Sequence, residues 1–214
     1  MEDVFAIIGK SGLMPVLTVE RVEDAVPIAE ALMAGGLPVA EVTFRTEAAA
    51  KAIAAMAKVP GLFLGAGTVL KPEQIDQAMD LGARFALAPG FNPKVAERAL
   101  EKNMAFIPGI CTASEIGLAL QMGFSVQKFF PAEPVGGTAY LKAVSAPFRG
   151  VRFVPTGSIG LEQLPDYLAL PSVLAVGGSW MVAPKLIQER RFDEITRLTR
   201  AAMDVVAKVR GQHP

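Results

Sequence analysis

The chain has 214 residues, of which 51% are hydrophobic, and its 21 Lys and Arg residues balance its 21 Asp and Glu residues. This length and composition predict one folded domain over residues 1–214 with a large apolar core. Because the chain carries no net charge, we expect neither a nucleic acid nor an anionic membrane as a partner.

The first twelve residues contain a short apolar segment and predict a helix that covers one end of the fold. Eight short apolar runs of strand composition follow, and they begin at Leu13, Leu37, Leu62, Ala83, Asn103, Phe124, Val151 and Ser172. Segments of helical period separate these runs, and several end at Gly or Asn, as helix C-termini do. The last segment, FDEITRLTRAAMDVVAKV, predicts a closing outer helix.

This alternation of strands and helices predicts the fold class. Apolar strands that alternate with helices are typical of parallel strands covered on both faces. Eight such units at this length predict an α/β protein with a closed (β/α)8 TIM barrel and an extra N-terminal helix. A doubly wound open sheet is the alternative, but no G-x-G-x-x-G motif follows the first strand.

Histidine and cysteine are too scarce for several kinds of site. The one histidine, His213, lies in a polar tail, and Cys111 is the one cysteine. A Ser-His-Asp or Cys-His nucleophile, a disulfide and a multi-cysteine or histidine metal site therefore lack their residues. We expect no metal and no cofactor. The start of the chain is too briefly apolar for a signal peptide, which favours a cytoplasmic protein.

A lysine lies within a strand that should be buried on both faces. In the predicted sixth strand, FSVQKFFPA, Lys128 shares one face with Val126 and Phe130. In the second strand Glu41 and Arg45 share a face, and Thr68 ends the third. Since barrel chemistry lies at the C-terminal ends of the strands, these side chains are predicted to converge there.

Two interpretations of Lys128 remain open at this stage. In the first, Lys128 forms an ion pair with Glu41 that only fills the interior. In the second, burial and the nearby charge of Arg45 disfavour the ammonium form and leave a free amine that attacks a carbonyl group.

Two glycine-rich segments follow the seventh and eighth strands. They are PTGSIG and GGSW. Barrels often bind phosphate at these positions through backbone N–H groups, so the two segments together predict a phosphate site.

At this point the chain resembles the class I aldolases of the 2-keto-3-deoxy-6-phosphogluconate (KDPG) and 4-hydroxy-2-oxoglutarate family. The resemblance rests on AGGLPVAEVTFRTEAA, GAGTVLKP, APGFNP, IPGICTASE, KFFPAEPVGG, PFRGVRFVPTGSI and LAVGGSW, in the family's order and spacing. The EVTFRTE and KFFPAE segments are specific to that family.

The resemblance implies residue roles. Lys128 would form a Schiff base with a keto acid, and Glu41 would move protons. Arg45 and Thr68 would hold the pyruvate carboxylate, with Pro89 lining the pocket. The implied reaction cleaves KDPG to pyruvate and glyceraldehyde 3-phosphate, with 4-hydroxy-2-oxoglutarate as a second substrate.

The resemblance also implies a binding site for the far end of the substrate. Thr156, Gly157, Ser158 and Ser179 would bind the phosphate, and the protein would be a homotrimer. The family usually has a second glycine where this chain has Ser158, so a hydroxyl stands where phosphate approaches the backbone.

Several alternatives remain. Glu133 follows Lys128 closely and could replace Glu41 as the base, although a capping role is favoured for it. An isomerase of phosphorylated sugar acids, or a synthase, on the same barrel would need an acid and a base but no imine. A non-catalytic binding protein is disfavoured, because a buried Lys, Glu and Arg together are costly.

Overall fold

The computed structural model describes residues 4–211, in which strands and helices alternate. The strands are β1 (Leu13–Leu17), β2 (Val39–Thr43), β3 (Phe63–Gly67), β4 (Phe85–Leu87), β5 (Ala105–Ile107), β6 (Gly109–Ile110), β7 (Val126–Phe129), β8 (Arg152–Pro155) and β9 (Val176–Gly178). The α-helices are α1 (Val4–Ser11), α2 (Ala25–Ala34), α3 (Ala49–Met56), α4 (Pro72–Asp80), α5 (Pro93–Glu101), α6 (Ala113–Gln121), α7 (Gly137–Ser145), α8 (Leu164–Leu168), α9 (Pro184–Gln188) and α10 (Phe192–Arg210). Short 3-10 helices span Val22–Asp24, Glu133–Val135 and Trp180–Val182.

The strands form two parallel sheets, and the prediction of a closed eight-stranded TIM barrel is wrong. The larger sheet has the order β5-β4-β3-β2-β1-β9, and the smaller has the order β6-β7-β8. The fold is therefore α/β with a curled parallel sheet of six strands and a second sheet of three. The larger sheet also lacks the reversal of strand order that a doubly wound sheet has beside its first strand.

The two breaks between the sheets have local causes. Pro108 separates β5 from β6, and because proline has no N–H group the ladder is interrupted there. On the other side, only the isolated bridges Phe153↔Val173 and Thr156↔Gly177 join β8 to the segment containing β9. β9 contains Gly177 and Gly178, and glycine weakens a strand because it loses more backbone entropy on folding and has no side chain to pack.

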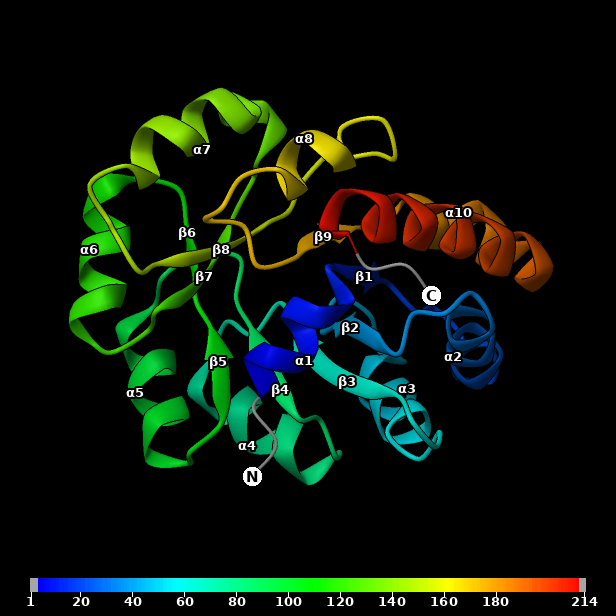
Figure 1. The fold of residues 1–214 in the computed structure, drawn as a ribbon. Coiled ribbons are helices and arrows are strands. Elements are labelled where there is room, and N and C mark those ends of the chain that lie inside the picture. The colour runs from blue at the N-terminus through cyan, green and yellow to red at the C-terminus, as the bar shows by residue number, and fades with distance from the viewer. Residues whose placement is uncertain (1–3, 212–214) are drawn as a thin grey trace.

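Helices surround the strands, and α1 lies across their centre (Figure 1). One large cluster of buried side chains lies between the strands and the surrounding helices. A second cluster fills the space inside the strands, where Met14, Val39, Phe85 and Val154 pack with Ile8 of α1. The helix predicted at the N-terminus is thus present, and it covers the interior.

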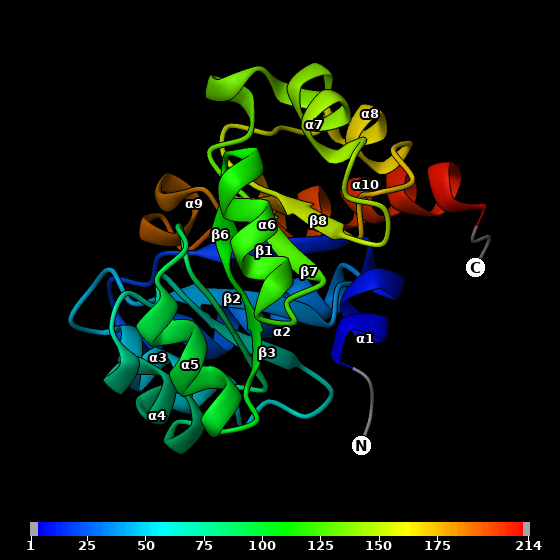
Figure 2. The same cartoon turned by 90° about the vertical axis from the view of Figure 1, so that its left-hand side faces the viewer.

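Helices α1 and α9 lie at opposite ends of the strands (Figure 2). Because all strand pairs are parallel, their C-terminal ends meet at the end nearer α9, and functional side chains are expected there. Within residues 4–211, no helix is long and apolar enough to cross a membrane.

Candidate active site

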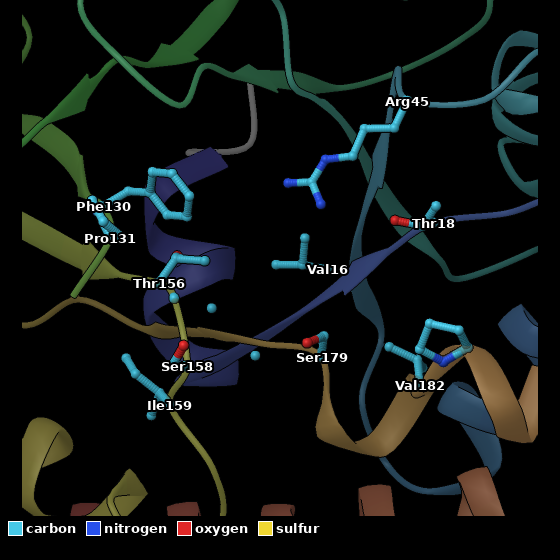
Figure 3. A pocket seen from close by; sticks show the side chains of 14 residues that line it. Val16, Thr18, Arg45, Phe130, Pro131, Thr156, Ser158, Ile159, Ser179 and Val182 are labelled. Atoms are coloured by element: carbon cyan, nitrogen blue, oxygen red, sulfur yellow. The ribbon is translucent and has the colours of Figure 1, made fainter. Parts of the chain in front are cut away.

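A cavity of about 380 Å³ opens at the C-terminal ends of the strands. Its walls come from β1 and β9 and from the segments that follow β1, β2, β7 and β8. Five residues predicted from the sequence line it: Arg45, Thr156, Gly157, Ser158 and Ser179 (Figure 3). Segments that are distant in the sequence therefore contribute to one site.

Lys128 and Glu41 form a buried ion pair. Lys128 Nζ lies 3.0 Å from Oε1 and 3.2 Å from Oε2 of Glu41, and the two side chains are 4% and 0% exposed. Nζ also lies 5.9 Å from the centre of the Phe130 ring, which lines the cavity. The amine is thus buried against a carboxylate, one side chain away from the open space.

The alternation of side chains along the strands places this pair. Lys128 lies on β7 between Gln127, whose amide donates to the Ile116 carbonyl of α6, and Phe129 of the outer cluster. Its two neighbours thus face the surrounding helices, so Lys128 faces the interior. Moving a charged side chain out of water costs roughly several kcal/mol per ion. The attraction between the two opposite charges offsets this cost.

A glycine makes room for the carboxylate of Glu41. Gly67 ends β3 beside β2, and a Cβ at this position would overlap Oε1, the carboxyl carbon and Cγ of Glu41. Gly67 is therefore needed for the close approach of side chain to backbone and not for its own backbone conformation.

Replacing Gly67 with alanine should displace the Glu41 carboxylate. Because a shift of about 1 Å in a catalytic group can lower rates by roughly 10²-fold, we expect Gly67→Ala to lower kcat by about that factor. The matched control is Gly117→Ala in α6, where an added Cβ meets only Phe148 at an ordinary 3.9 Å. Steady-state kinetics with normal kcat for Gly67→Ala would contradict this positioning role.

Arg45 offers the cavity a cation with free donors. Its Nε donates to Thr68 Oγ1 at 3.2 Å, and its two terminal nitrogens point into the cavity (Figure 3). Within residues 4–211, no carboxylate forms an ion pair with Arg45. A guanidinium with two free nitrogens suits a planar carboxylate, which it can bind through both oxygens.

Thr68 has an unusual backbone conformation. Its φ is +56°, in the left-handed region that a β-branched residue rarely adopts. Such strain is of order 1–3 kcal/mol and persists where the surroundings hold it. Here it places the hydroxyl that orients Arg45.

The opposite wall of the cavity carries the glycine-rich segments. Thr156 is buried and continues β8, while Ser158 and Ser179 are exposed. Gly157 and Ser158 have φ values of +115° and +59°. The hydroxyl that this chain has in place of a glycine thus stands on left-handed backbone at the cavity wall, where a glycine would avoid about 1–2 kcal/mol of strain.

Pro89, like Lys128, Glu41 and Thr68, was predicted at the site but does not line the cavity. It follows β4, is half-buried, and its backbone lies against Gly109, where a Cβ would overlap it. Gly109 in turn pairs in register with Lys128. Pro89 therefore lies beside the strand that neighbours the lysine.

Other residues that line the cavity were not predicted. Phe130 and Pro131 lie in the KFFPAE segment, directly after the lysine, and Val16 and Thr18 lie at the end of β1. The alternation of side chains along β1 could have predicted Val16 and Thr18, because Met14, on the same face, packs in the inner cluster.

Glu133, the alternative base, is engaged elsewhere. Its carboxylate accepts a hydrogen bond of 2.5 Å from the Tyr167 hydroxyl, and it does not line the cavity. Burial, and secondly the hydrogen bond to Glu133, raises the pKa of Tyr167, so this hydroxyl remains a donor. The geometry favours the structural role for Glu133.

Within residues 4–211, no group of three or more His, Cys, Asp or Glu side chains is placed to hold a metal ion. His213 lies outside the described residues. The reactive groups at this end of the strands are thus the guanidinium of Arg45 in the cavity and the amine and carboxylate of Lys128 and Glu41, buried behind Phe130. An amine beside a carboxylate can form an imine with a carbonyl compound, and the carboxylate can move the protons that this chemistry requires.

Comparison with known proteins identifies the class as an aldolase. The model of the KDPG and KHG aldolase family matches residues 4–198. The chain is 49% identical over 207 residues to the 2-dehydro-3-deoxy-phosphogluconate aldolase of Treponema pallidum. The matched region covers 96% of this chain and 99% of that relative.

Solved structures agree with this result. The KDPG aldolase of Zymomonas mobilis with 3-phosphoglycerate has a TM-score of 0.90 and 43% identity, covering 95% of this chain and 96% of the other. The KDPG aldolase of Legionella pneumophila, with pyruvate captured as a covalent carbinolamine, has a TM-score of 0.90 and 40% identity, covering 94% and 98%. The chain belongs to the KDPG and KHG aldolase family, and the resemblance inferred from its sequence is confirmed.

Proposed function

We propose that the protein is a class I aldolase that cleaves KDPG to pyruvate and glyceraldehyde 3-phosphate, with 4-hydroxy-2-oxoglutarate as a second substrate. The observation that carries the proposal is the buried contact of 3.0 Å between Lys128 Nζ and the Glu41 carboxylate beside the cavity. The family of the chain and the names of its relatives support the reaction class.

In this proposal Lys128 is the nucleophile. The Nζ lone pair attacks C2 of the keto acid, and the former carbonyl oxygen leaves as water to give a protonated imine. The C3–C4 bond then breaks, its electron pair moves toward the imine nitrogen, and the aldehyde leaves. The remaining enamine takes a proton at C3, and water hydrolyses the imine to release pyruvate and the free amine.

Glu41 would carry the proton between these steps. It accepts the proton of the C4 hydroxyl, through a water molecule, as the C3–C4 bond breaks, and the same proton later reaches C3 of the enamine. One carboxylate suffices, because the proton gained in the first step is lost in the second. Its contact with the Lys128 amine through both carboxylate oxygens supports this role.

The two ends of the cavity would hold the two ends of the substrate. Arg45, oriented by Thr68, would bind the carboxylate next to C2 through its free nitrogens. The segments containing Thr156, Gly157, Ser158 and Ser179 would bind the phosphate, and Pro89 would close the site beside β6. Backbone N–H groups of such glycine-rich turns are suitable phosphate ligands.

The proposal includes a cytoplasmic homotrimer. Several large apolar side chains are exposed on one chain, among them Leu70, Leu100 and Leu118, at 53%, 49% and 51%. Burial of some of these between subunits would be favourable. The mass of the protein in solution tests this part.

Borohydride trapping tests the chemistry. Incubation with pyruvate and sodium borohydride, followed by peptide mapping, should give a reduced pyruvyl adduct on Lys128 and on no other lysine. If folded protein gives no adduct with pyruvate in excess, the aldolase proposal is overturned. A fully active Lys128→Arg variant would instead favour an isomerase or synthase, which needs no imine.

A further inference from the structure

Thr18 places in the cavity a hydroxyl group to which no role has been assigned so far. It follows β1, where Leu13 and Leu17 pack in the outer cluster and Met14 packs in the inner cluster. Val16 and Thr18 therefore continue the inner face, and both line the cavity. The Thr18 side chain is directed into the open space between Arg45 and Ser179 (Figure 3).

The hydrogen bonds behind Thr18 decide what its hydroxyl can offer. Thr43 Oγ1 donates its single proton to the Leu17 carbonyl at 2.8 Å. Thr43 Oγ1 lies 3.4 Å from Thr18 Oγ1, and because its proton is already used, it can only accept a hydrogen bond from Thr18. The Thr18 proton points to Thr43, so its oxygen presents lone pairs to the cavity.

An acceptor at this place selects a donor on the substrate. A carboxylate bound at Arg45 and a phosphate bound at the glycine-rich segments carry no proton to donate, so neither is the partner of Thr18. The atoms between these two ends in a phosphorylated hydroxy-keto acid are the carbons that carry hydroxyl groups.

We propose that Thr18 is a specificity-determining residue that accepts a hydrogen bond from the C5 hydroxyl of KDPG, an inference that rests on the proposed function. The C4 hydroxyl is the other donor, but it loses its proton to Glu41 during cleavage. The C5 hydroxyl keeps its proton and leaves with the aldehyde product. In 4-hydroxy-2-oxoglutarate C5 is a carboxylate carbon, so Thr18 has no partner there.

The two substrates provide the test. Thr18→Val keeps the shape of the side chain and removes the oxygen. We expect kcat/KM for KDPG to fall roughly tenfold, the scale of one lost hydrogen bond, while kcat/KM for 4-hydroxy-2-oxoglutarate stays within about twofold. Thr18→Ser, which restores the hydroxyl, should restore the ratio between the substrates.

The matched control is Thr46→Val. Thr46 donates to the Val19 carbonyl nearby but does not line the cavity, so its loss should leave the substrate ratio unchanged. Thr18→Ala repeats the comparison if the valine variant does not fold. Equal losses on both substrates, or no loss on either, would overturn the role of Thr18.

Borohydride trapping separates this inference from the proposed function. Pyruvate has no hydroxyl group, so Thr18→Val should give the same yield of pyruvyl adduct as the unchanged protein. An adduct on Lys128 together with an unchanged substrate ratio refutes only the role of Thr18. No adduct and no turnover in the unchanged protein refute both proposals.

Discussion

Lys128→Met should abolish both turnover and the borohydride adduct. Methionine fills the same narrow space but has no amine, so no imine forms. We expect kcat to fall by roughly 10⁴-fold or more, on the scale at which loss of a covalent nucleophile lowers it. Cleavage of KDPG, followed by pyruvate release, measures the effect.

Two controls separate chemistry from folding in this experiment. Lys142→Met on the exposed face of α7 should keep full activity. Because Lys128→Met leaves Glu41 buried without its partner, some loss of stability is expected. The double variant Lys128→Met with Glu41→Gln removes both charges and should recover stability but not turnover, whereas recovered turnover would refute Lys128 as nucleophile.

Glu41→Gln should lower kcat by about 10² to 10⁴-fold, the usual contribution of a general acid–base group. Glutamine keeps the size of the side chain and its contact with Lys128 but cannot take up a proton. The lysine remains in place, so the pyruvyl adduct should still be trapped after long incubation. Kinetics and trapping on one variant thus separate proton transfer from imine formation.

Glu133→Gln is the comparison that assigns the base. Glu133 binds the Tyr167 hydroxyl and lies outside the cavity, so its substitution should cost about 1–2 kcal/mol of stability while kcat changes little. A larger fall in kcat for Glu133→Gln than for Glu41→Gln would move the proton-transfer role to Glu133.

The pairing of Lys128 with Glu41 could be predicted although 87 positions separate them. Side chains alternate strictly along a strand, and the C-terminal ends of parallel strands meet at one end of the sheet. Local patterns on two strands therefore suffice to bring two polar residues together. The same reasoning placed Arg45 and the two glycine-rich segments around one cavity.

The closure of the sheet could not be predicted in this way. Counting strands indicates how many units exist, but not whether each neighbouring pair forms a continuous ladder. Pro108 interrupts one edge, and two isolated bridges replace a ladder at the other. Both interruptions of the ladder depend on backbone geometry, which hydrophobic periodicity does not report.

The apolar interior beneath the site has a consequence for the order of events. Ile8 of α1 and the side chains packed on it are buried toward the N-terminal ends of the strands, and the cavity lies at the opposite, C-terminal ends. In the proposed reaction, substrate would enter and both products would leave at the C-terminal ends. Because pyruvate would still be bound to Lys128 when the C3–C4 bond breaks, the phosphorylated aldehyde must depart first. The covalent bond to Lys128 would thus fix the order in which the two products are released.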